Sequence, residues 1–176
     1  RTVLGGSEPH PEVVQAMHLA GRYYVDMDEL FIRSGEVIAD MIRAPAALVT
    51  PGCAAALVLG TAACLTGDDP KKMAQLPDLK GLKDQVIIQR PQRYKYDRMV
   101  RMTGAEIVPV GSETCATADH IEDAISEHTA AVLYPEIDAP GSYLSVEEVV
   151  RIAHRHGLPV IVDSAYKVYP LDGLHR

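Results

Sequence analysis

Residues 145–163 read SVEEVVRIAHRHGLPVIVD, and this stretch decides the fold class. Ser145 and Glu148 have the spacing of a capping box, which satisfies the free amide groups at the start of a helix. Gly157 is predicted to end that helix. The apolar run that follows predicts a buried strand that ends at Asp163. A helix followed at once by a strand that is apolar on both faces is typical of an α/β fold with a parallel sheet.

The same alternation of helices and strands extends toward the N-terminus. Further strands are predicted by apolar runs at residues 46–49, 86–88, 106–110 and 130–134. Helices are predicted by periodic patterns at residues 11–20, 28–42, 53–65 and 117–126, with a helical segment from Tyr94 to 102 and a surface connection at 69–83. We therefore expect a mostly parallel sheet with helices on both faces. Residues 1–45 are expected to form an N-terminal helical segment, and residues 46–176 the first part of a larger α/β domain.

Four of the predicted helices are expected to bury apolar side chains. The predicted inward residues are Val13, Val14, Met17, Leu19 and Ala20 in the first helix, Leu30, Ile32, Val37, Ile38 and Met41 in the second, and Ile121, Ala124 and Ile125 in the helix at 117–126. The helix at 53–65 is nearly all apolar, which indicates burial on several sides.

Composition excludes several classes of protein. The chain has 176 residues, 47% of them hydrophobic, and a formal net charge of −7. Such an acidic balance disfavours nucleic-acid binding, which needs a basic face. The uncharged stretch at 44–67 is broken by the turn signal Pro51-Gly52, so we expect no membrane span. Three cysteines without metal-type spacing indicate a reducing compartment, which favours the cytoplasm.

The segment TPGCAA at residues 50–55 places a tight turn at the start of a predicted helix. Small side chains leave the first-turn amides of Gly52, Cys53 and Ala54 open, and the helix dipole favours an anion there. A phosphate group fits this pattern, although a helix start that packs tightly for structural reasons has the same pattern. Neither a GxGxxG nor a Walker motif is present, so a dinucleotide or ATP is not indicated.

Asp163 lies where ligands bind in open α/β sheets, beyond the carboxyl end of a strand. A partly desolvated carboxylate at this position requires a cation or hydrogen-bond donors. The alternative is that Asp163 begins the next turn. The seven histidines show no metal-binding pattern, and we expect no metal site.

Together, the helix start and Asp163 resemble the cofactor site of fold-type I pyridoxal-phosphate (PLP) enzymes. The chain is most similar to the branch that contains selenocysteine synthase and D-glucosaminate-6-phosphate ammonia-lyase. The segments that carry the resemblance are YVDMDE (24–29), VTPGCAAA (49–56), ACLTG (63–67), LPD (76–78), VIIQR (86–90), RYKYD (93–97) and VIVD (160–163).

The resemblance implies a large domain of the aminotransferase-like fold that binds PLP. It implies that the helix start holds the cofactor phosphate and that Asp163 pairs with the protonated pyridine nitrogen, which strengthens the ring as an electron sink. The implied cofactor-binding residues are Gly52, Cys53, Ala54, Gln89, Asp163 and Ala165. Which residue stacks on the ring stays open.

One feature departs from that family. Its enzymes attach PLP as a Schiff base to a lysine some tens of residues beyond the aspartate. Lys167 is the single lysine after Asp163, and it lies too close, in the loop that follows the same strand. We therefore expect that the Schiff-base lysine and the C-terminal portion of the domain are absent from this chain, and that the chain as given is inactive.

Three functions remain in competition. The first is a PLP-dependent lyase that eliminates or deaminates an amino acid or a phosphorylated amino-sugar acid, with a homodimer expected by resemblance. The second is a non-catalytic α/β module that binds a phosphorylated ligand or a partner subunit. The third is a PLP-dependent racemase or selenium transferase.

Overall fold

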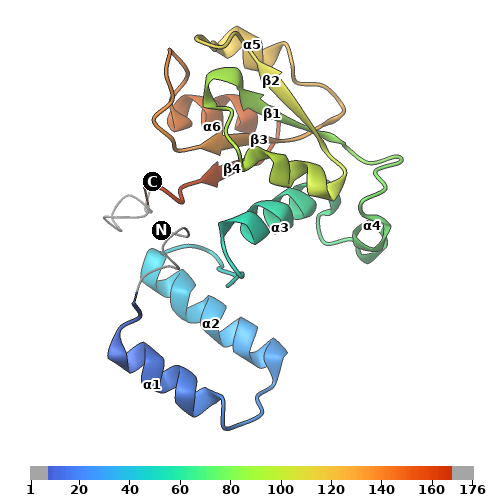
Figure 1. Cartoon of the computed structure of the whole chain (residues 1–176). Coiled ribbons are helices and arrows are strands. Elements are labelled where there is room, and N and C mark those ends of the chain that lie inside the picture. Colours follow the sequence, from blue (N-terminus) through green and yellow to red (C-terminus); the bar gives the residue numbers. More distant parts are fainter. Residues whose placement is uncertain (1–7, 168–176) are drawn as a thin grey trace. The chain divides into compact units, whose positions relative to one another are not determined.

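The computed structural model describes residues 8–167, which divide into two compact units (Figure 1). The first unit ends at Val49 and the second begins at Thr50. Within the described residues, no helix is both long and apolar enough to cross a lipid bilayer.

The first unit contains two helices, α1 (Pro11–Ala20) and α2 (Met27–Ile42). Asp26 caps α2, because its carboxylate accepts a hydrogen bond from the amide of Glu29 at 2.9 Å. Gly35 lets the following segment approach α2 closely, since an added Cβ would lie 2.4 Å from the carbonyl oxygen of Ala47.

Several expectations about this unit are wrong. Residues 46–49 form no strand, because four apolar residues without a neighbouring strand have no hydrogen-bonding partner. The predicted inward faces of both helices are exposed: α1 has no buried residue, and in α2 only Gly35 and Ala39 are buried. The exposed residues that were predicted inward are Val13, Val14, Met17, Leu19, Leu30, Ile32, Val37 and Met41. An apolar stripe predicts a buried face only where another element covers it.

The second unit begins with α3 (Cys53–Thr66) and α4 (Pro70–Gln75). It continues with β1 (Gln85–Gln89), two 3₁₀ segments η2 (Arg90–Gln92) and η3 (Asp97–Thr103), β2 (Glu106–Val110), α5 (Ala118–Glu122), β3 (Thr129–Pro135), α6 (Val146–Arg155) and β4 (Val160–Asp163). The capping box at the start of α6 is confirmed. The side chains of Ser145 and Glu148 each accept a hydrogen bond from the backbone amide of the other residue.

The four strands form one parallel sheet in the order β2-β1-β3-β4. Their carboxyl ends share one edge, because Gln89 pairs with Val110 and Pro135 pairs with Asp163. The predicted strands at 86–88, 106–110, 130–134 and 159–162 and the α/β fold class are therefore confirmed. Parallel strands need crossover connections, and the helices between them supply these.

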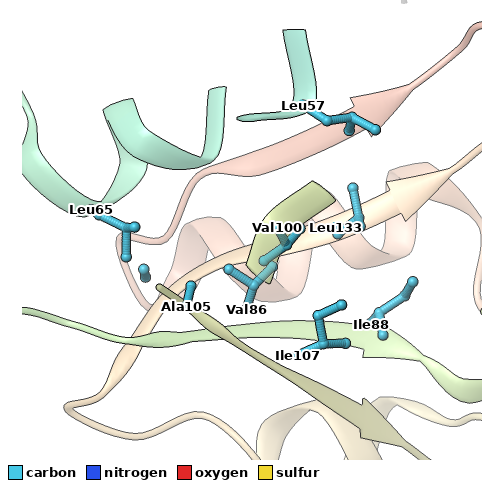
Figure 2. Packing of buried hydrophobic residues seen from close by; sticks show 9 residues of the cluster. Leu57, Leu65, Val86, Ile88, Val100, Ala105, Ile107 and Leu133 are labelled. Atoms are coloured by element: carbon cyan, nitrogen blue, oxygen red, sulfur yellow. The ribbon is translucent and has the colours of Figure 1, made fainter. Parts of the chain in front are cut away.

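Two hydrophobic clusters lie on the two faces of the sheet. On one face, Leu57 and Leu65 of α3 pack with Val86 of β1 and Leu133 of β3 (Figure 2). On the other face, Ile87 of β1 packs with side chains of α6. Alternate residues of a strand point to opposite faces, so consecutive β1 residues are buried in different clusters. Helices thus cover both faces, as expected.

The structure corrects three further expectations in this unit. Only one side of α3 is buried, through Leu57, Thr61, Leu65 and Thr66, because the sheet covers a single face of that helix. The segment after Tyr94 forms the 3₁₀ segment η3 and not an α-helix. The connection at 69–83 contains α4, which Asp69 caps through the amide of Lys71.

Candidate functional site

Asp163 is the last residue of β4 and is buried, with 5% of its surface exposed. Its Oδ1 accepts hydrogen bonds from the thiol of Cys53 at 3.2 Å and from the backbone amide of Ala165 at 3.1 Å. Its Oδ2 accepts a hydrogen bond from the hydroxyl of Tyr94. Both oxygens therefore act as acceptors, which is the pattern of an ionised carboxylate.

All of these donors are neutral groups. Within residues 8–167, no Lys, Arg or His side chain forms an ion pair with Asp163. A buried carboxylate normally pairs with a cation or a metal, because desolvating a charge is unfavourable. In the described residues, the carboxylate of Asp163 is therefore held by hydrogen bonds from neutral groups.

The start of α3 lies beside this carboxylate. Gly52, at the N-cap, has φ = 122°, a backbone conformation that glycine adopts and other residues avoid. No side chain caps the helix, and in the described part of the chain the first-turn amides of Cys53 and Ala54 have no acceptor. These amides and the helix dipole form an anion-binding end.

Cys53 joins the two features. It is the first residue of α3, and its Sγ lies 3.2 Å from Oδ1 of Asp163. Burial, with the hydrogen bond and negative charge of Asp163, raises the pKa of the Cys53 thiol to about 11. The thiol is therefore protonated at neutral pH and donates to the carboxylate.

A cavity of about 130 Å³ opens between these elements. It is lined by Cys53, Ala56 and Leu57 of α3 and by Ile161, Val162, Asp163, Ser164 and Ala165 at the end of β4. Small side chains at the helix start and after Asp163 leave this space open. The structure therefore brings together the helix start and the strand end that the sequence predicted separately.

Tyr94 is a site residue that the sequence analysis did not assign. It lies between η2 and η3, 69 positions before Asp163 in the chain. Burial, followed by the hydrogen bond to Asp163 and that residue's charge, raises the pKa of the phenol well above its usual range. Its hydroxyl is therefore a neutral donor. No spacing rule in the sequence links it to Asp163.

Of the other residues singled out from the sequence, Ala165 lies at the cavity, whereas Gln89 and Lys167 bind elsewhere in the protein. Ala165 contributes its amide to Asp163 and lines the cavity. Gln89 is 1% exposed, and its amide group bonds to the backbone of Leu144 and to Gln92. The side chain of Gln89 is thus occupied within the protein, and the structure does not bring it to Asp163. Lys167 pairs with Asp138 at 3.4 Å.

No group of three or more His, Cys, Asp or Glu side chains is arranged to hold a metal ion in residues 8–167. All three cysteines, Cys53, Cys64 and Cys115, are free thiols.

A parallel sheet whose carboxyl edge carries an open helix start and a buried carboxylate defines part of the cofactor domain of a fold-type I PLP enzyme. A family profile agrees with this assignment over residues 27–169, described as the DegT/DnrJ/EryC1/StrS aminotransferase family. The chain belongs to this family, and pyridoxal phosphate is the cofactor that the family implies.

Two curated relatives match over 93% of the chain. A D-glucosaminate-6-phosphate ammonia lyase of Salmonella typhimurium is 34% identical, and a 5'-C-glycyluridine monooxygenase-decarboxylase of Streptomyces is 30% identical. The chain spans 46% and 43% of the lengths of these two proteins.

Solved structures give the same result for the fold. A D-glucosaminate-6-phosphate ammonia-lyase structure aligns with a TM-score of 0.88 and 33% identity, covering 93% of this chain and 46% of that one. An aspartate aminotransferase from Thermotoga maritima aligns with a TM-score of 0.56 and 21% identity, covering 89% and 43%, and shows the shared fold alone.

The residues present fit PLP. Asp163 lacks a cationic partner in the described residues and lines the cavity. The first-turn amides of α3 offer donors to a phosphate. The methyl group of Ala165 lines the space without filling it.

Proposed function

We propose that the protein carrying this chain is a PLP-dependent lyase that releases ammonia from an amino-sugar acid phosphate. The observation that supports this most is the buried carboxylate of Asp163 beside the open start of α3, which neutral donors hold in the described part of the chain. The similarity to the ammonia lyase, at 34% identity over 93% of the chain, supports the substrate class.

The chain's own residues have three tasks in this proposal. The amides of Gly52, Cys53 and Ala54 bind the cofactor phosphate, because the helix start presents donors and positive potential. Asp163 accepts a hydrogen bond from the cofactor's pyridine nitrogen and keeps that nitrogen protonated. Ala165 holds Oδ1 through its backbone amide and leaves room for a flat ring.

Bound PLP supplies an electron sink for the electron pair left on the substrate α-carbon when its proton is removed. The proposed overall reaction removes that proton together with the β-hydroxyl group as water. Addition of one water then gives an α-keto acid and ammonia, so atoms balance without an external oxidant or reductant.

Lys167 does not act as the lysine that attaches the cofactor in this proposal. It follows Asp163 closely in the chain and forms an ion pair with Asp138. When the 176-residue chain is mixed with PLP and reduced with borohydride, we expect no single lysine to be labelled. Stoichiometric labelling of Lys167, detected by peptide mass spectrometry, would overturn this assignment.

The test uses the full-length protein, loaded with PLP and supplied with D-glucosaminate-6-phosphate. We expect equal amounts of ammonia and α-keto acid, measured by coupled assays. Asp163→Ala should lower kcat by at least about 100-fold, because loss of the pyridine nitrogen's partner weakens the electron sink. Glu113→Ala, an exposed carboxylate whose partner is Arg90, is the control and should keep normal turnover.

Other outcomes identify the alternatives. Release of carbon dioxide without ammonia would favour the chemistry in the name of the Streptomyces relative. Isomerisation or selenium transfer without ammonia would favour the racemase or the selenocysteine-synthase reading. PLP binding without any turnover would favour a non-catalytic module.

A cytoplasmic homodimer belongs to the same proposal. Three free thiols are consistent with a reducing compartment. The exposed apolar side chains of α1 and α2 give the first unit a surface that a second copy would cover.

A further inference from the structure

We propose that Tyr94 is a positioning residue that holds Asp163 in its ionised form, with Oδ1 turned toward the cofactor cavity. This inference rests on the proposed role of Asp163 as partner of a pyridine nitrogen. Its basis is the division of contacts on the carboxylate: Tyr94 donates to Oδ2, whereas the cavity residues Cys53 and Ala165 donate to Oδ1.

The position of Tyr94 is itself fixed by several contacts. Its backbone amide donates to Asp97 at 3.4 Å, and Asp97, which is buried, forms an ion pair with Arg93. Its ring meets the ring of Tyr96 edge to face, with centroids 6.1 Å apart, and packs on the cluster that contains Leu57. The phenol therefore approaches Asp163 from a turn that these contacts hold in place.

Donation to Oδ2 has a definite electrostatic consequence. A hydrogen bond to the charged form of an acid favours that form over the neutral one. When a pyridine nitrogen shares a proton with Oδ1, a carboxylate whose charged form is held by a donor on Oδ2 leaves that proton on nitrogen. Without the phenol, the shared proton would move toward the carboxylate, which weakens the charge on the ring.

The two oxygens of the Asp163 side chain have different roles: Oδ1 is available to the ligand, and Oδ2 fixes the orientation of the carboxylate. Oδ1 has a thiol as one of its donors, and a thiol is a weak donor that a charged ring nitrogen can replace. Oδ2 has the stronger phenolic donor, so its contact can persist when a ligand is bound. The carboxylate would then keep its orientation while its partner on Oδ1 changes.

The experiment compares Tyr94→Phe with wild type in the full-length protein loaded with PLP labelled with ¹⁵N in its ring. We expect the wild-type nitrogen resonance at the position of a protonated pyridine. In Tyr94→Phe it should move toward the unprotonated position, and kcat should fall about tenfold with little change in KM. Tyr96→Phe is the matched control, because in the described residues its hydroxyl makes no hydrogen bond, and it should match wild type.

Asp163→Asn separates failure of this inference from failure of the proposed function. If Asp163→Asn shifts the nitrogen resonance while Tyr94→Phe leaves resonance and kcat unchanged, the role of Tyr94 is wrong and that of Asp163 stands. If Asp163→Asn also leaves the resonance at the protonated position, the proposed function itself is wrong. Circular dichroism of each variant shows that a loss does not arise from unfolding, and the resonance shift distinguishes tuning from a merely structural contact.

Discussion

The three side chains Cys53, Tyr94 and Asp163 come from distant parts of the sequence and meet at one carboxylate. Each contact has a separate physical effect. The thiol and the phenol remain protonated because burial and the nearby negative charge raise the pKa of both groups. As neutral donors they stabilise the carboxylate without neutralising it, which leaves its charge available to a cationic ligand.

The pKa of the Cys53 thiol depends in part on the charge of Asp163. With its pKa at about 11, the fraction of thiolate at pH 9 is small and rises only as the pH approaches 11. Asp163→Asn removes the charge that contributes to this shift, so the pKa should fall part of the way toward 9. Desolvation, the largest cause, would remain. We expect alkylation of Cys53 by iodoacetamide at pH 9 to become at least roughly threefold faster.

The measurement needs a chain in which Cys53 is the one reactive thiol. Cys64→Ala and Cys115→Ala provide that background. Asp138→Asn is the control, because this exposed carboxylate pairs with Lys167 and does not contribute to the Cys53 shift. Equal alkylation rates in the Asp163→Asn and control chains would show that the contact with Cys53 is absent in solution.

At the residue scale, the sequence predicted part of the site. Asp163 and Gly52 stand out because a strand end and a glycine before an apolar helix are local patterns. Tyr94 could not be predicted, since its contact with Asp163 joins the irregular segment between η2 and η3 to the end of β4, which lies 69 positions later in the chain. Gln89 was predicted to face the cofactor from its place at a strand end, but spacing does not reveal its hydrogen bonds to Leu144 and Gln92.

At the element scale, the start of α3 depends on one glycine. Gly52 has φ = 122° and ψ = 170°, where a Cβ is strained even though no neighbouring atom would clash with it. Gly52→Ala should lower the free energy of unfolding by about 1–3 kcal/mol. In the full-length protein it should also weaken PLP binding, because the first-turn amides would move.

Gly60 lies in the same helix, and its substitution by alanine is a control that should change the stability in the opposite direction. It lies within α3, has no positive φ, and an added Cβ would meet no atom within 4 Å. Gly60→Ala should therefore raise the free energy of unfolding by about 0.5–1 kcal/mol. Urea unfolding of both variants provides the comparison. If Gly52→Ala stabilises the chain as Gly60→Ala does, the described conformation of the helix start is incorrect.

At the element scale, the helices and strands that were predicted correctly have both a start or stop residue and a regular apolar pattern in the sequence. The capping box and the apolar run of α6 and β4 identify these two elements and their order. Residues 46–49 have the apolar run of a strand but no partner strand, and a strand forms only when its backbone groups pair. The residues after Arg90 form short 3₁₀ turns, whose pattern differs little from that of an α-helix over a few residues.

At the scale of the whole molecule, the first unit stands out by its exposed apolar side chains. Most exposed large hydrophobic residues of the described chain lie between Val13 and Val49. A large number of exposed apolar side chains in one unit indicates an interaction surface. We therefore expect the chain to sediment at tens of micromolar as a species heavier than its 19.1 kDa monomer.

The variant Leu30→Lys/Met41→Lys tests that expectation on α2. Both side chains are exposed, so charge there should reduce association without unfolding the sheet. Met102→Lys is the control in the second unit, because the exposed fraction of Met102 lies between those of Leu30 and Met41, and this variant should not affect association. Sedimentation velocity and fluorescence of a hydrophobic dye report the result. A wild-type chain that remains monomeric and does not bind the dye would contradict the assignment of this surface.

The central claim is that the start of α3 and Asp163 bind opposite ends of one PLP molecule. A crystal structure of the full-length protein with PLP tests this most directly. We predict that the phosphate contacts the amides of Gly52, Cys53 and Ala54, and that the ring nitrogen lies within hydrogen-bond distance of Oδ1 of Asp163. A phosphate bound away from α3, or a ring nitrogen facing a residue other than Asp163, would contradict it.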